Sequence, residues 1–185
     1  MIVHAGQDAL APDLAAGLRR ITVQAWPGSD ERHDPLLDPE LFVDVEDGRV
    51  VAGLAVLTKD VVVAERRWRA AGLSAVVVAE EERGCGRAGA LAAAARSWIV
   101  GEHGADVGLL TCDRPLVPLY ERAGWAVLPG AVLVGGTVER PFPSDSPGMD
   151  KPVLAAWPSG AEAAVRAAFE QVRIPLHPGA IDRLW

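Results

Sequence analysis

The sequence predicts one α/β (α+β) domain across residues 1–185, with a mixed, largely antiparallel sheet flanked by helices. Two observations predict this fold class. Strand-like apolar runs before residue 79 form antiparallel pairs, and a glycine-rich turn then leads from an apolar run into an alanine-rich helix. The chain shows neither an internal repeat nor a domain linker, and its length suits one compact domain.

Two hairpins account for the antiparallel part of the predicted sheet. The first pairs Leu41–Val45 with Val50–Leu57, because Glu46-Asp47-Gly48 between them is typical of a hairpin turn. We predict the second from the runs Val61–Arg66 and Gly72–Val78.

The other elements are predicted from helical spacing, apolar runs and breakers. Leu14, Leu18 and Ile21 recur at helical spacing behind Pro12, which suits the first turn of a helix. In chain order the predictions are a strand at Met1–Val3, a helix at Ala11–Ala25, a loop or irregular helix at Pro27–Glu40, a helix from about Arg87 to Glu102, a strand at Val107–Cys112, a short helix at Asp113–Gly124, strands within Trp125–Val134 and Val153–Trp157, a loop at Pro141–Pro152 and a helix at Ala161–Val172.

Composition excludes several function classes. Acidic side chains outnumber basic ones by 25 to 18, and the formal net charge of −7 is a poor match for nucleic acid. Two cysteines are too few for a disulfide framework or a zinc site. The sequence has no apolar stretch of membrane-spanning length and no secretion signal at its start. We therefore expect a cytoplasmic protein with no metal, membrane or nucleic-acid partner.

The most informative segment is the glycine-rich turn between Val76–Val78 and the alanine-rich helix. Free N–H groups at a helix start bind phosphate oxygens, and glycines let the backbone approach them closely. Arg83 and Arg87 can add positive charge. The turn lacks the Gly-Lys-Ser/Thr of a P-loop, and the preceding hairpins do not suit a dinucleotide fingerprint. An ordinary strand-to-helix turn that contains glycines by chance is the alternative.

Two motifs in this region resemble one known superfamily. Arg83-Gly84-Cys85-Gly86-Arg87-Ala88 matches the R/Q-x-x-G-x-G/A signature of the GNAT acetyl-CoA-dependent N-acetyltransferases. The strand Val107–Cys112, followed by Pro118-Leu119-Tyr120-Glu121-Arg122-Ala123-Gly124-Trp125, is similar to the second hallmark of that superfamily. The resemblance implies a GNAT fold whose central fourth and fifth strands splay apart.

The same resemblance implies where acetyl-CoA binds as co-substrate. The pantetheine arm is expected to lie in the gap between the splayed strands and to pair like an added strand with the backbone of Val76, Val77 and Val78. The pyrophosphate is expected at the turn formed by Arg83, Gly84, Cys85, Gly86, Arg87, Ala88 and Gly89. An apolar run such as Val76–Val78 would equally suit plain sheet core.

Tyr120 is the one catalytic residue that the resemblance implies. The superfamily often places a tyrosine beside the leaving thiolate, and Tyr120 is the only tyrosine in the chain. Proton transfer from a phenol of pKa about 10 to a thiolate of pKa about 8.5 is uphill by roughly 2 kcal/mol, so hydrogen bonding to the thiolate can matter as much. A half-buried tyrosine that only packs its helix is the alternative. No general base can be assigned among the histidines or the run Glu80-Glu81-Glu82.

Within the superfamily, the whole chain most resembles the aminoglycoside 2′-N-acetyltransferases. That resemblance implies a cationic amine substrate held by acidic groups, with a tail at about residues 160–185 that completes the acceptor site. The implied substrate-binding residues are Asp30, Asp34, Thr111, Asp150, Asp182 and Trp185, the last residue.

Departures from that family leave the acceptor open. Ser74 stands where the family has a glutamate that is a candidate base, and solvated loop aspartates are an alternative reading of the acidic set. The alternative acceptors are a kasugamycin-like drug, another small amine and a protein N-terminus. The alternative to catalysis is a CoA-binding module without turnover. Edge strands near residues 125–134 could pair two subunits.

Overall fold

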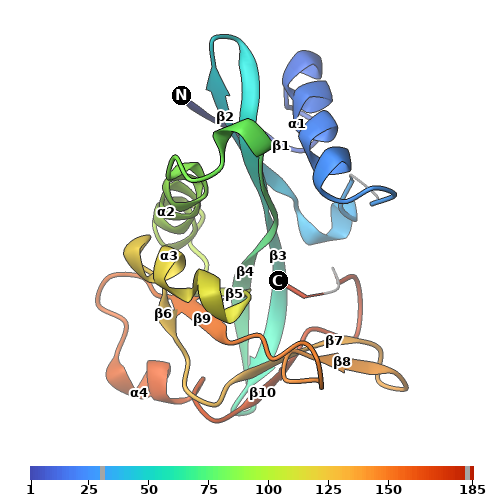
Figure 1. Cartoon of the computed structure of the whole chain (residues 1–185). Helices are drawn as coiled ribbons and strands as arrows, with labels where there is room; N and C mark the ends of the chain where they lie inside the picture. Colours follow the sequence, from blue (N-terminus) through green and yellow to red (C-terminus); the bar gives the residue numbers. More distant parts are fainter. Residues whose placement is uncertain (30–31, 182–183) are drawn as a thin grey trace.

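The computed structural model of the chain describes residues 1–29, 32–181 and 184–185. A seven-stranded sheet with the strand order β1-β2-β3-β4-β5-β9-β6 forms its centre (Figure 1). The strands are β1 (Ile2–Gly6), β2 (Glu40–Glu46), β3 (Arg49–Val63), β4 (Arg66–Val78), β5 (Val107–Thr111), β6 (Ala126–Val127) and β9 (Val153–Ala156). Every neighbouring pair is antiparallel except β4 with β5. The predicted mixed, largely antiparallel sheet is confirmed.

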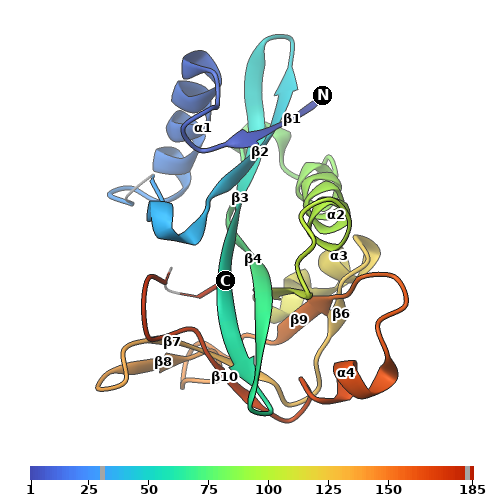
Figure 2. The ribbon, with the colours of Figure 1, turned by 180° about the vertical axis from the view of Figure 1, so that it is seen from behind.

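Helices cover both faces of this sheet. One face carries α1 (Pro12–Ala25), and the other carries α2 (Arg87–Val100) and α3 (Val117–Arg122) (Figures 1 and 2). α1 covers one apolar core, and α2 and α3 together cover the other. Leu109 belongs to the core beneath α1 and the next residue, Leu110, to the core beneath α2, because successive side chains of a strand point to opposite faces.

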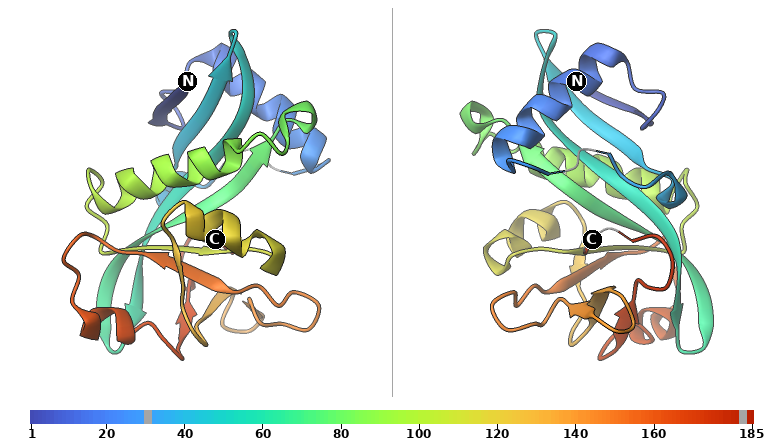
Figure 3. Two further views of the ribbon diagram at one scale, coloured as in Figure 1. Left: turned by 60° about the vertical axis from the view of Figure 1, so that its left-hand side comes forward. Right: turned by 90° about the vertical axis from the view of Figure 1, so that its right-hand side faces the viewer.

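A three-stranded sheet of order β10-β7-β8 lies with α4 at the opposite end of the molecule from α1 (Figure 3). Its elements are β7 (Val132–Gly136), β8 (Pro141–Pro143), α4 (Ala163–Ala167) and β10 (Arg173–Pro175). Short 3₁₀ turns occur at Pro35–Leu37, Glu80–Glu82 and Arg114–Leu116.

The two central strands splay apart. β4 and β5 pair only through Ala70–Gly72 and Val107–Leu109. Beyond Gly72, β4 continues along β3, while β5 continues along β9. A bulge at Ala75, whose φ is 50°, shifts the register of β4 against β3 just past the point of parting. The splay that the resemblance implied is therefore confirmed.

The second predicted hairpin is wrong in its boundaries. Residues 61–63 continue β3, since Thr58, Lys59 and Asp60 stay paired with β4 instead of turning. The reversal occurs at Ala64-Glu65, where both residues have positive φ (49° and 59°), as a two-residue hairpin turn requires. The sequence has no glycine or asparagine at this turn to announce it.

Two other boundaries also differ from the predictions. The helix predicted at Ala161–Val172 covers only Ala163–Ala167, because the chain reverses at Gln171 (φ 53°) and enters β10. The predicted loop Pro141–Pro152 begins with the short strand β8. Both short strands form only by pairing with β7, which local sequence patterns do not reveal.

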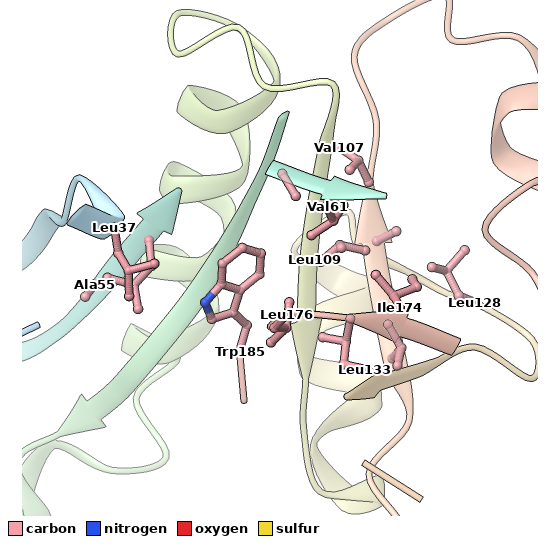
Figure 4. Close-up of a cluster of buried hydrophobic side chains, with 14 of the residues drawn as sticks. Leu37, Ala55, Val61, Val107, Leu109, Leu128, Leu133, Ile174, Leu176 and Trp185 are labelled. Carbon is pink, nitrogen blue, oxygen red and sulfur yellow. The ribbon is translucent and has the colours of Figure 1, made fainter. Parts of the chain in front are cut away.

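Trp185 lies within the core beneath α1 and is only 2% exposed (Figure 4). Its indole ring packs against Gly72 of β4, where a Cβ atom would come within 2.2 Å of the ring. Glycine at residue 72 thus makes room for this tryptophan beside the parting strands. Among the described helices, none has the length and apolar character needed to cross a membrane.

Candidate active site

A cavity of about 390 Å³ opens where β4 and β5 part. Ser74 and Val76 of β4 and Thr111 of β5 contribute to its walls. Tyr120 from α3 and Lys151, which precedes β9, also line it. The splay therefore creates a hollow in the middle of the sheet, bordered by residues far apart in the sequence.

Tyr120 is buried at this cavity, with an exposed fraction of 6%. Burial raises the pKa of its phenol to about 12, and the nearby Cys112 and Asp113 add to that effect. Helix α3 ends at Arg122, and the Trp125 N–H donates a 3.0 Å hydrogen bond back to the Tyr120 carbonyl. The hydroxyl consequently keeps its proton throughout the neutral range.

The edge of β4 beyond Gly72 leads from this cavity toward α2. Within the described residues, this edge pairs with no strand, because β5 has diverged from it. Val76 and Val78 are half-buried there, whereas Val77 is buried in the core beneath α1. An extended ligand could add to this edge as a strand would.

The edge ends at an exposed turn before α2. The Ala79 N–H donates a 2.9 Å hydrogen bond to the Val51 carbonyl, and the chain then passes through Gly84 and Gly86, whose φ angles are 80° and 81°. Both glycines have open space around them, so backbone conformation rather than crowding requires them. The first N–H groups of α2 follow at once, and they suit an anion.

Comparison with known protein families identifies this arrangement. The model of the acetyltransferase (GNAT) domain matches residues 18–128, which contain the turn, the parted strands and Tyr120. The chain belongs to the GNAT acetyltransferase family.

Solved structures show the GNAT fold as well. An acyl-CoA N-acyltransferase from Pseudomonas aeruginosa aligns over 84% of this chain and 98% of its own, with a TM-score of 0.59 and 13% identity. Escherichia coli ElaA gives the same coverage with a TM-score of 0.58 and 12% identity. A GCN5-related N-acetyltransferase from Anabaena variabilis aligns over 70% of this chain with a TM-score of 0.54 and 21% identity. The chain spans about a third of that protein, since the alignment covers 33% of it. No curated protein matches the chain significantly in sequence.

The two arginines of the GNAT turn have different surroundings. Arg83 is exposed, and in the part of the chain that the structure describes its side chain forms no ion pair. Arg87 is directed away from the turn, into a group of carboxylates on β2 and the preceding 3₁₀ turn. The prediction that the Arg87 side chain adds charge for phosphates therefore has no support in this arrangement. Cys85 is exposed at the tip of the turn.

A second and larger cavity lies on the α1 side of the acetyltransferase. It has a volume of about 750 Å³ and shares four lining residues with the first cavity, namely Trp26, Ala75, Lys151 and Leu184. Residues 27–29, 32–34 and 37 and the tail residues Ile181 and Leu184 form much of its lining. We refer to it as the acceptor cavity, because Asp34, one of the residues that the resemblance implies for acceptor binding, lines it.

The predicted acceptor residues have different surroundings. Asp34 lines the acceptor cavity, and its Oδ1 accepts a 2.9 Å hydrogen bond from the Leu36 N–H. Asp150 forms two 2.6 Å hydrogen bonds with Arg114, and those bonds hold its pKa below the usual range. Asp30 and Asp182 lie outside the described residues.

The remaining two predicted acceptor residues contact each other. The N–H and hydroxyl groups of Thr111 both donate to the backbone carbonyl of Trp185. That carbonyl thereby continues the hydrogen bonding of β5 where β4 has left it. Trp185 forms part of the cavity wall, and its side chain is buried.

Sequence reasoning missed several residues of the site. Asp44 and Glu82 contact Arg87, and Arg49 contacts Glu81 and Glu82. In the run Glu80-Glu81-Glu82, where no general base could be assigned, the carboxylates of Glu81 and Glu82 form ion pairs. The signal in the sequence for these contacts is that acidic residues and arginines lie close together near the turn. It does not indicate which residues form pairs.

Proposed function

We propose that the protein transfers the acetyl group of acetyl-CoA to an amine of a small molecule. The observation that carries this proposal is one continuous path. The unpaired edge of β4 joins the cavity at Tyr120 to the glycine turn at the start of α2. A thioester, an extended arm and a pyrophosphate need these three features in this order.

The residues present fit acetyl-CoA. Residues Val76–Val78 offer an open strand edge for an amide-bearing arm, and the first N–H groups of α2 with Arg83 suit a pyrophosphate. When bound, acetyl-CoA supplies the thioester whose acetyl group passes to the amine. The protein contributes by holding the two reactants in the same cavity, which alone lowers the barrier substantially.

Tyr120 serves the leaving sulfur as a hydrogen-bond donor. With a pKa of about 12, full proton transfer to a thiolate of pKa about 8.5 is uphill by about 5 kcal/mol. A hydrogen bond from the neutral hydroxyl is the more favourable contribution, since it stabilises developing negative charge without moving the proton. Such a donor is worth about a hundredfold in kcat.

For the acceptor we propose an amine of an aminoglycoside-type antibiotic, acetylated at the 2′ position, so that the enzyme confers resistance. Three features support this class besides the sequence resemblance. Trp26 and Phe142 line the first cavity although 44% and 41% of their surfaces are exposed, and they offer flat faces to sugar rings. Asp34 supplies a carboxylate in the acceptor cavity for an ammonium group.

A second acceptor class is favoured by the apolar part of the same wall. Leu116 is a further exposed large apolar residue at the first cavity, with 43% of its surface accessible. Exposed apolar residues gathered at one cavity are typical of ligand contacts. A small amine with an apolar or aromatic body would cover them without needing several carboxylates.

The test is release of the free thiol from acetyl-CoA in the presence of a panel of amines. One arm holds aminoglycosides with a 2′-amine and matched compounds with a 2′-hydroxyl, and a second arm holds arylalkylamines. Turnover that requires the 2′-amine supports the first class. Turnover only with arylalkylamines supports the second acceptor class. Binding of acetyl-CoA without turnover of any amine contradicts catalysis.

Variants on α3 test the role of Tyr120. Tyr120→Phe is expected to lower kcat about a hundredfold with little change in acetyl-CoA affinity. Glu121→Gln is the matched control, because Glu121 is the next residue on the same helix and its side chain is exposed. Equal activity of Tyr120→Phe and Glu121→Gln would remove Tyr120 from the mechanism.

A further inference from the structure

A network of opposite charges lies behind the glycine turn. The guanidinium of Arg87 donates to Asp44 at 2.9 Å, to Glu82 at 2.9 and 3.0 Å, and to Glu46. All three of its nitrogen atoms are thus engaged by carboxylates. The side chains of Arg87 and Asp44 are 17% and 10% exposed, so this is not an ordinary surface ion pair.

A second arginine joins the network from β3. Arg49 donates to Glu81 at 2.6 Å and to Glu82 at 3.1 Å. Glu82 therefore receives one arginine on each carboxylate oxygen, Arg49 at Oε1 and Arg87 at Oε2. We call Asp44, Glu82, Arg87 and Arg49 the turn clamp.

The turn clamp connects the parts whose relative position determines the anion site. Arg87 is the first residue of α2, Glu82 ends the 3₁₀ turn, and Asp44 lies on β2. The glycines between Glu82 and Arg87 are exposed and have no packing of their own to fix them. Asp44 and Glu82 accept hydrogen bonds from the Arg87 guanidinium, and these bonds raise the pKa of Arg87.

We propose that the turn clamp is a positioning device that holds the N–H groups of the turn in the geometry that binds the pyrophosphate of acetyl-CoA. This inference rests on the proposed function. Arg87 is then a positioning residue and not a phosphate ligand, although both arginines belong to the same glycine-rich motif. Arg83, exposed at the turn, supplies the side-chain charge.

The direction in which Asp44→Asn changes the affinity for acetyl-CoA distinguishes the two roles of Arg87. If Arg87 holds the turn, Asp44→Asn loosens the clamp and weakens acetyl-CoA binding. If Arg87 is instead a phosphate ligand restrained by Asp44, the same substitution frees its charge and strengthens binding. Isothermal titration of acetyl-CoA into the protein of residues 1–185 measures the difference directly.

The expected result is about tenfold weaker acetyl-CoA binding for Asp44→Asn and for Arg87→Met, with the double variant little worse than either single one. The KM for acetyl-pantetheine, which lacks the pyrophosphate, should stay unchanged in all three. If Asp44→Asn folds poorly, Glu82→Gln serves as a second test of the turn clamp. Arg67→Met is the matched control, since Arg67 forms an exposed 3.1 Å pair with Asp60 at the far end of β3 and β4.

The dependence of acetyl-CoA binding on ionic strength gives an independent test of the turn clamp. A direct phosphate contact makes binding weaken with ionic strength, so Arg83→Met should reduce that dependence and Arg87→Met should preserve it. Tighter binding by Asp44→Asn, or wild-type affinity in Arg87→Met, overturns the clamp while the proposed function stands. A wild-type protein that does not bind acetyl-CoA overturns both.

Discussion

At the scale of single residues, Tyr120 is the group whose chemistry can be measured most directly. It is the only tyrosine, so ultraviolet difference absorbance of the phenolate reports one ionisation. The midpoint is expected near pH 12 in the folded protein, because burial at the cavity disfavours the phenolate, and near 10 in denaturant. A folded-state midpoint near 10 would place the hydroxyl in open water and contradict the described site.

The same shift has a consequence for stability. Because the pKa of Tyr120 is higher in the folded state, its contribution is fully present below about pH 10 and is lost as the pH rises through about 12. Tyr120→Phe should flatten the pH dependence of the unfolding free energy in that window. The variant then serves as the control for assigning the alkaline transition to one residue.

Individual side chains also show where sequence reasoning stops. The local motif predicted that Tyr120 lies at the site, and the structure places it at the cavity. Arg87 contacts Asp44, which is 43 residues away in the sequence, and Thr111 contacts Trp185, which is 74 residues away. Which hydrogen bonds such residues form depends on tertiary packing, so a spacing pattern could locate them without giving their roles.

At the scale of elements, the tail after β10 is held by one lysine of β3. Lys59 donates to the carbonyls of Leu176 and Ala180, the latter at 2.8 Å. Lys59→Met keeps the apolar stem but removes the donor, so the free energy of unfolding should fall by about 2 kcal/mol. Acetyl-CoA affinity should not change, because the turn is remote from this contact.

Hydrogen exchange gives the decisive measurement for Lys59→Met. The Thr111 amide donates to the Trp185 carbonyl, so loosening of the tail should speed exchange of that amide. Arg67→Met again serves as the control on the same strand pair. Unchanged protection of Thr111 in Lys59→Met would show that the tail is held by the burial of Trp185 alone.

Elements with strong local signals were predicted well, and those defined by distant pairing were not. The helix at Ala11–Ala25 and the first hairpin agree closely with α1, β2 and the start of β3. β10 was missed, because three residues beside β7 carry no periodicity of their own. The turn at Ala64-Glu65 was misplaced, since tertiary pairing imposed a conformation that these residues rarely adopt.

At the scale of the whole molecule, much of the acidity forms ion pairs instead of an open acidic pocket. Asp44 and Glu82 bind Arg87, and Asp150 binds Arg114. In the described acceptor cavity, Asp34 is accompanied by the cationic Arg32 and Lys151. The net charge of −7 is therefore weak support for a polycationic substrate, and the acceptor panel tests the aminoglycoside proposal more stringently than composition can.

Ligand binding should stabilise the entire fold, because the proposed path joins elements that belong to both cores. Val77 packs in the core beneath α1, whereas Tyr120 belongs to the core beneath α2. A ligand that binds only the folded state adds about 2.7 kcal/mol at a hundred times its Kd, which corresponds to a rise in Tm of about 5–10 °C for a chain of this size. Thermal unfolding with acetyl-CoA measures the rise, and Arg87→Met at the same ligand concentration should show a smaller one. An unchanged Tm at acetyl-CoA concentrations that saturate turnover would mean that the ligand does not bridge these elements.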